Sequence, residues 1–152
     1  MKNILVSACL LGLPCRYDGR SMPSREVISL GEKYNLIPVC PEIYGGLPTP
    51  RVPSERVGDK VLMKDGHNVT ENYQRGAECA LMLARIYSVD MAILKAKSPS
   101  CGCGRIYDGT FSGTLTDGLG VTAELLVNNG IRVITEEELV ENGGELSLDE
   151  QK

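Results

Sequence analysis

Three of the six cysteines in this 152-residue chain come shortly after apolar segments that predict buried strands. The cysteines are Cys9, Cys40 and Cys101, and the segments before them are residues 4–8, 36–39 and 91–94. The carboxyl ends of parallel strands form one edge of an open α/β sheet, where ligands bind. If the three strands are parallel neighbours, we expect the three thiols to meet there. Soft thiolate ligands select zinc, cuprous copper or iron–sulfur clusters.

The alternative is that these cysteines are small buried side chains, because free Cys is among the most buried residue types. Three thiols at matching strand ends favour a metal or cluster site over that alternative. The other cysteines, Cys15, Cys79 and Cys103, are interpreted as buried thiols without a role, although Cys103 could substitute for Cys101.

Polar side chains that could act on a substrate lie close to these cysteines in the sequence. Glu42 follows Cys40 by two residues, and a partly desolvated carboxylate can be a general acid or base. The alternative is that Glu42 is a surface residue or a helix cap. Ser98 and Ser100 come just before Cys101, so their hydroxyls could reach a substrate or satisfy the N–H groups of a turn.

A phosphatase interpretation of the first loop is weaker. Low-molecular-weight tyrosine phosphatases have a Cys-x5-Arg phosphate loop after their first strand, whereas Cys9 and Arg16 are separated by six residues. Pro14 removes a backbone N–H that such a loop would need. A late Asp-Pro general acid is also missing from the sequence.

The elements that must position these residues alternate between strand and helix. Strands are predicted at residues 2–9, 36–40, 91–94 and 131–135, and helices at 23–33, 71–88, 123–128 and 136–139. Residues 41–60 are predicted to be a proline-rich loop without helix, residues 61–69 a small hairpin, and residues 96–119 a long functional loop. This order predicts an α/β fold: a single three-layer domain with a central, mostly parallel sheet of about four strands, Rossmann-like or flavodoxin-like.

Size and charge limit the classes of function. We expect one domain over residues 1–141 and a polar C-terminal tail over residues 142–152. The net charge of -4 argues against nucleic acid as a partner, and a small molecule is the better candidate. Without a secretory signal or a membrane-spanning apolar run, we expect a cytoplasmic protein that does not bind membranes.

Five groups of residues, taken together, resemble a known family. They are SACLLG with RYDG (residues 7–12 and 16–19), CPE with GGLPTPR (40–42 and 45–51), NVT with GA (68–70 and 76–77), LK with SPSCG (94–95 and 98–102), and GVTA (120–123). The chain is similar over about residues 3–135 to domain-of-unknown-function family 523, which contains the thiouracil desulfidases.

The resemblance implies a [4Fe-4S] cluster held by Cys9, Cys40 and Cys101, with one iron left open. That iron would bind the sulfur of a thiocarbonyl substrate such as a thiouracil, and water would replace the sulfur without net redox change. Glu42 and one of Ser98 or Ser100 would be the acid–base and substrate-positioning residues. The alternative function is an iron–sulfur binding or sulfur-carrying module without hydrolytic turnover.

Overall fold

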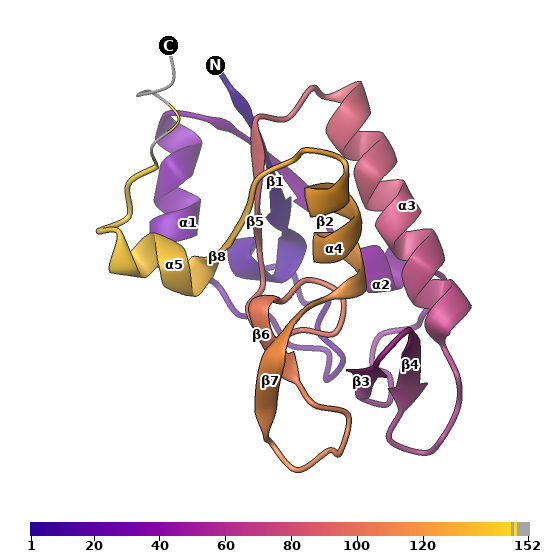
Figure 1. The fold of residues 1–152 in the computed structure, drawn as a ribbon. Coiled ribbons are helices and arrows are strands. Elements are labelled where there is room, and N and C mark those ends of the chain that lie inside the picture. Colours follow the sequence, from indigo (N-terminus) through magenta and orange to yellow (C-terminus); the bar gives the residue numbers. More distant parts are fainter. Residues whose placement is uncertain (147, 149–152) are drawn as a thin grey trace.

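A four-stranded sheet forms the centre of the molecule (Figure 1), in a computed structural model that describes residues 1–146 and 148. Its strands, in spatial order, are β2 (Asn35–Val39), β1 (Asn3–Ser7), β5 (Met91–Leu94) and β8 (Val133–Thr135). Every neighbouring pair of strands is parallel. The predicted α/β class with a parallel sheet of four strands is confirmed.

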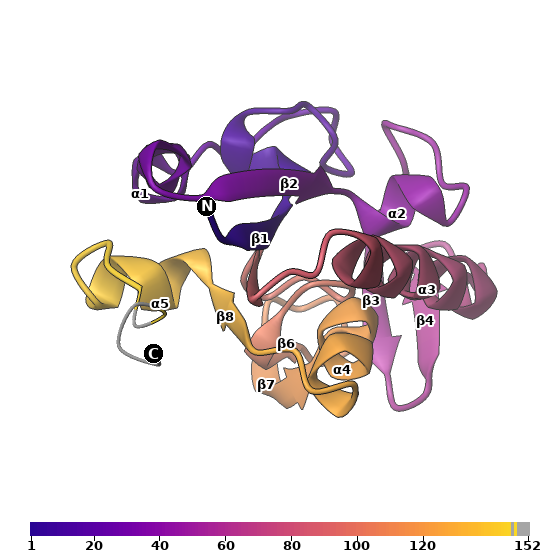
Figure 2. The same cartoon turned by 90° about the horizontal axis from the view of Figure 1, so that it is seen from above.

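Helices cover both faces of this sheet and give the domain three layers (Figure 2). One face carries α1 (Arg25–Ser29), the 3₁₀ helix η2 (Leu30–Glu32) and α5 (Glu136–Glu141), and the other carries α3 (Thr70–Ile86) and α4 (Val121–Asn128). In β1, Ile4 and Val6 pack into the first layer and Leu5 packs into the second. The strand is therefore buried on both faces, as its continuous apolar run predicts.

Two apolar residues that the helical patterns place inside are on the surface. Ile28 of α1 is 46% exposed and Ile86 of α3 is 66% exposed. In α3 the buried stripe runs through Ala77, Leu81 and Ala84. Ile86 follows Ala84 by only two residues, so its side chain points to another side of the helix.

The proline-rich stretch after β2 contains regular structure, which corrects the prediction of a loop without helix. Pro41 begins a one-turn helix, α2 (Pro41–Tyr44), at the position where a missing N–H has no cost. Further on, β3 (Ser54–Val57) pairs antiparallel with β4 (Lys60–Met63). The hairpin predicted within residues 61–69 is reduced to a single bridge between Leu62 and Asn68.

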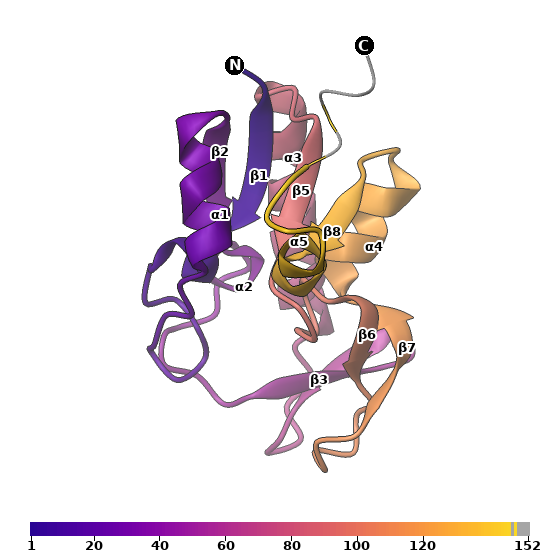
Figure 3. The same ribbon diagram turned by 90° about the vertical axis from the view of Figure 1, so that its left-hand side faces the viewer.

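The long loop after β5 also contains a hairpin that the sequence does not predict. Its strands are β6 (Cys103–Tyr107) and β7 (Leu115–Leu119), which pair antiparallel. Only Ile106 of β6 is buried, so the segment lacks the apolar alternation that identifies a strand. Figure 3 shows that both hairpins lie beyond the carboxyl end of the sheet, with β3 beside β6 and β7.

Two leucines near the C-terminus pack against the core. Leu148 is buried against the α1 and α5 side of the core, and Leu146 packs there too. The Lys2 ammonium donates to the carbonyl of Leu148 at 3.0 Å. Residues 147 and 149–152 of the expected tail lie outside the described residues, and the division at residue 141 stays a prediction.

Gly76 allows α3 to contact α2. A Cβ atom at Gly76 would overlap the backbone carbonyl of Pro41. We therefore expect Gly76→Ala to lower the free energy of unfolding by about 1–3 kcal/mol or more, as overpacked sites do. Urea denaturation of the variant measures this, and Gly31→Ala is the control because its Cβ would meet Leu36 at an ordinary 3.6 Å. Equal losses in both variants would show that the contact with α2 is unimportant.

Candidate functional site

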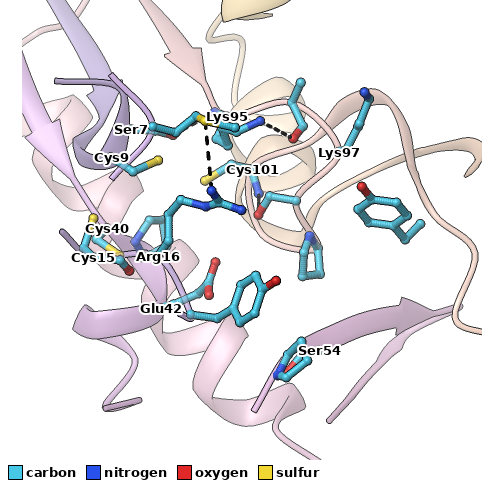
Figure 4. A pocket seen from close by; sticks show the side chains of 18 of the residues that line it. Ser7, Cys9, Cys15, Arg16, Cys40, Glu42, Ser54, Lys95, Lys97 and Cys101 are labelled. Carbon is cyan, nitrogen blue, oxygen red and sulfur yellow. Dashed lines mark hydrogen bonds between the residues drawn. The ribbon is translucent and has the colours of Figure 1, made fainter. Parts of the chain in front are cut away.

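A cavity of about 590 Å³ opens at the carboxyl edge of the sheet (Figure 4). Its walls come from the loops after β1, β2 and β5, from the two hairpins, and from the first turns of α3 and α5. The hairpins are joined at Glu55 of β3, whose Oε1 accepts from the backbone N–H groups of Gly109 and Phe111 at 2.9 and 3.1 Å. Four cysteines line this cavity: Cys9, Cys15, Cys40 and Cys101.

The three predicted ligands reach the cavity because their strands are neighbours. Cys9 lies in the 3₁₀ helix η1 (Ala8–Leu11), directly after β1. Cys40 lies between β2 and α2, and Cys101 lies in the loop after β5. Since β1 is the middle strand between β2 and β5, the three thiols converge on one edge, and Figure 4 shows them around the same space.

Cys101 is held in a fixed position at the base of the cavity. It is 4% exposed, and burial raises the pKa of its thiol to about 12 although a hydrogen bond with Ser7 lowers it. Its backbone N–H donates to the hydroxyl oxygen of Ser98 at 3.1 Å. An empty site therefore keeps this thiol protonated, and binding of a metal centre would release the proton.

Glu42 lies in α2 and faces the cavity beside Cys40. Arg51 donates two hydrogen bonds to Glu42 Oε2, from Nε at 3.0 Å and from Nη2 at 2.7 Å. The Arg51 and Glu42 side chains are only 3% and 16% exposed. Burial lowers the pKa of Arg51, but the carboxylate outweighs it and raises that pKa, so the guanidinium stays charged. The carboxylate is therefore held in one orientation at the cavity wall.

The two candidate serines have different surroundings. Ser100 is fully buried, and its hydroxyl shares a 2.9 Å hydrogen bond with that of Thr122. Ser98 lines the cavity, and its oxygen accepts from the N–H groups of Ser100 and Cys101. Because that oxygen is an acceptor in both bonds, the Ser98 proton is left to donate into the cavity.

The comparisons with known proteins agree with this site. The 2-thiouracil desulfurase family matches residues 4–138 of the chain. The chain belongs to this family. The resemblance inferred from the sequence motifs is thereby confirmed.

Two relatives of this family member are similar over nearly the whole chain. The uncharacterized protein YbbK of Bacillus subtilis (strain 168) is 44% identical over 146 residues, which cover 90% of this chain and 97% of that protein. The solved structure of TudS, a [4Fe-4S]-dependent thiouracil desulfidase, matches with a TM-score of 0.87 and 48% identity. This match covers 93% of this chain and 95% of that chain.

Cys15 is the cavity residue of this family member that the sequence did not assign. It is 8% exposed, and its side chain lies close to those of Cys40 and Cys9. The interaction with Cys40 lowers the pKa of Cys15, but the interaction with Cys9 and burial outweigh it and raise the pKa to about 11. The same contact with Cys15, together with burial, raises the pKa of Cys40. The only sequence signal was its position six residues after Cys9.

Most cations of the cavity are paired with carboxylates. Lys95 Nζ lies 2.9 Å from Glu136, and Lys97 Nζ lies 3.3 Å from Glu137. Arg16 instead contacts the sulfur of Met22 at 4.0 Å and lies near the ring of Tyr17. In Figure 4 its guanidinium extends across the cavity between Cys101 and Glu42.

Three residues with reactive side chains are not part of the cavity wall. Cys79 lies in α3, as expected from the helical pattern. Cys103 begins β6, and its thiol donates to the carbonyl of Val133 at 3.7 Å. His67 is paired with Asp65 on the surface, where its side chain is 77% exposed.

The donor set of the cavity fits an iron–sulfur cluster better than a single metal ion. Among residues 1–146 and 148, no group of three or more His, Cys, Asp or Glu side chains is arranged to hold one ion. Thiolates around a single zinc ion lie roughly 4 Å apart, whereas a four-iron cluster is larger and needs ligands that lie further apart. Cys9, Cys40 and Cys101 reach one cavity from three separate strand ends, and three Cys thiolates are ligands suited to such a cluster.

Arg51 is expected to be essential for stability because it neutralises a buried carboxylate. Arg51→Ala leaves Glu42 unpaired, and we expect the free energy of unfolding to fall by about 3–5 kcal/mol. Denaturant unfolding of the cluster-free protein measures this. Arg105→Ala is the control, since Arg105 and its partner Asp117 are 61% and 96% exposed and their pair should contribute little. A similar small loss for Arg51→Ala would contradict the assignment.

Proposed function

We propose that this protein is a [4Fe-4S]-dependent enzyme that removes sulfur from a thiocarbonyl compound, such as a thiouracil, and releases sulfide. The observation that carries the proposal is the convergence of Cys9, Cys40 and Cys101 on one cavity beside Glu42. The family and the 48% identity to a [4Fe-4S]-dependent thiouracil desulfidase support the same chemistry.

Cys9, Cys40 and Cys101 would hold the cluster in this cavity. When bound, it supplies a Lewis-acidic iron that polarises a carbon–sulfur double bond. Three protein ligands for four irons would leave one iron without a protein ligand. The overall reaction is a hydrolysis: one water supplies the oxygen that replaces sulfur, and its two protons leave with sulfide. No electrons are lost or gained.

Glu42 and Ser98 are proposed to move and direct the protons of this reaction. Arg51 holds Glu42 Oε2, and in the part of the chain that the structure describes no hydrogen bond to Oε1 is formed. Oε1 can therefore take a proton from the attacking water and return one to the departing sulfur. The Ser98 hydroxyl can donate a hydrogen bond to the substrate or the leaving sulfur.

Features of the whole chain support a location and a class of substrate for the proposed enzyme. The structure shows all six cysteines as free thiols, which fits a reducing compartment such as the cytoplasm. No helix among the described residues is long and apolar enough to cross a bilayer. The negative net charge supports a small thiolated molecule rather than a nucleic acid as substrate.

The test is turnover of 2-thiouracil and 4-thiouracil by protein reconstituted with iron and sulfide under anaerobic conditions. We expect loss of the thione absorbance and release of one sulfide for each substrate consumed. Cys40→Ser, treated identically, is the inactive control. A protein that binds a cluster but releases no sulfide from any thiocarbonyl tested would instead be a binding or sulfur-carrying module.

Alanine substitutions of Ser98 and Ser100 are expected to affect different properties, turnover in one case and stability in the other. Ser98→Ala should lower turnover per cluster by about 10- to 100-fold, which is the effect of one hydrogen bond to a charged group. Ser100→Ala should leave turnover per cluster almost unchanged but lower the free energy of unfolding by about 1–3 kcal/mol, because Thr122 loses its buried partner. Turnover normalised to iron content, with denaturant unfolding, separates the two. The opposite assignment of effects would make Ser100 the substrate-contacting residue.

A further inference from the structure

We propose that Cys15 and Cys40 form a reversible disulfide in the cluster-free protein, and that this bond prevents cluster loading until it is reduced. The structural basis is a contact between two thiols of the cavity, one of which is a proposed cluster ligand. The effect on loading rests on the proposed function, whereas formation of the disulfide does not.

The contact between these side chains is direct. The Cys40 thiol donates to the carbonyl oxygen of Cys15 at 3.8 Å, and the two side chains lie close enough for each to change the pKa of the other. Figure 4 shows the two sulfurs side by side at the same wall of the cavity. Residues in such contact need little backbone movement to form a disulfide.

Arg51 links the loop that carries Cys15 to the start of α2, next to Cys40. Its Nη2 donates to the carbonyl of Cys15 at 3.0 Å, while Nε and Nη2 also donate to Glu42, two residues after Cys40. The guanidinium is buried and charged, so the loop after β1 and the start of α2 are held together. The two sulfurs therefore stay in contact even when no cluster links them.

The other thiols of the cavity are less suited to this bond. Cys101 is 4% exposed and hydrogen-bonds to Ser7. Cys9 lies near Cys15 too, but the Cys40 thiol is bonded to the Cys15 carbonyl at 3.8 Å, and Arg51 holds these two segments together. Cys40 is also partly exposed, so a small oxidant can reach it through the cavity. We therefore assign the bond to Cys15 and Cys40.

The reaction needs a two-electron oxidant, for which we name a peroxide. Two S–H bonds break and one S–S bond forms, so that the thiols lose two electrons and two protons. Hydrogen peroxide accepts both and becomes two molecules of water. Reduction by a dithiol reverses the change. A Cys40 sulfur in the disulfide cannot act as a thiolate ligand. Only Cys9 and Cys101 then remain of the three proposed cluster ligands.

The test uses full-length cluster-free protein that is treated with hydrogen peroxide and then freed of it. We expect the loss of two of the six thiols and of the mass of two hydrogen atoms, both restored by dithiothreitol. Trypsin should release residues 3–16 joined to residues 34–51, and fragmentation should place the bond at Cys15 rather than Cys9. Cys15→Ser should keep its remaining thiols, whereas Cys9→Ser and Cys79→Ser should still lose two thiols to the same disulfide.

Cluster loading is measured on the same samples by iron content. Oxidised protein should take up no cluster until dithiothreitol is added, and oxidised Cys15→Ser should load without it. Cys15→Ala and far-ultraviolet circular dichroism check that the variants are folded. A thiol loss that persists in both Cys15 variants, or a bond mapped to Cys9, would overturn the proposal. If the disulfide forms as expected but reduced protein neither binds a cluster nor releases sulfide, the proposed function fails instead.

Discussion

Cys101→Ser is expected to abolish cluster binding, whereas Cys103→Ser is expected to leave it largely intact. Cys101 lies at the base of the cavity, and its oxygen replacement is a poor ligand for an iron–sulfur cluster. Cys103 is only two residues further, but it begins β6, and its thiol donates to Val133 away from the cavity.

Iron and sulfide analysis after anaerobic reconstitution measures this difference, and the visible absorbance of the cluster reports it independently. The two variants control for each other, since each removes one thiol from the same loop. Equal loss of iron in both would mean that Cys103 shares the third ligand position. Retention in both would remove this loop from the cluster site.

Glu42→Gln is expected to lower turnover by about 10²- to 10⁴-fold without loss of the cluster, which is the range for removal of a general acid or base. The amide keeps the size of the carboxylate, and its oxygen can still accept from Arg51. It cannot take a proton from water at neutral pH. Loss of proton transfer by Glu42 should therefore slow desulfuration without preventing cluster assembly.

The measurement is the desulfuration rate per cluster, with iron content determined on the same sample. Glu55→Gln is a matched control, because Glu55 also lines the cavity but accepts hydrogen bonds from the hairpin backbone. A Glu42→Gln protein with a full cluster and near-normal turnover would move the proton-transfer role to Ser98, which also lines the cavity.

Much of the fold could be predicted from local sequence patterns. The apolar runs of β1 and β5 indicate strands buried on both faces, and the helical stripe of α3 indicates a helix packed on the sheet. Alternation of these elements then restricts the topology to a parallel sheet. The position of a cysteine shortly after each of the strands β1, β2 and β5 was enough to predict that the three thiols meet.

Other parts of the fold could not be predicted, because their local signals are weak. The strands of the β6–β7 hairpin carry little apolar alternation, and β3 follows a proline-rich stretch. These strands are stabilised by contacts between hairpins, such as those of Glu55 with Gly109 and Phe111. No pattern within either segment contains that information.

The sequence alone determined the three-layer fold and the three cysteines at one edge of the sheet, because strand periodicity and strand ends are local properties. Only the tertiary structure decided which side chains surround them. Cys15 contacts Cys40 across 25 residues, and Arg51 binds Glu42 and the Cys15 carbonyl from a third segment. Such contacts depend on how loops from different strands fold over one cavity, and burial there gives them their strength.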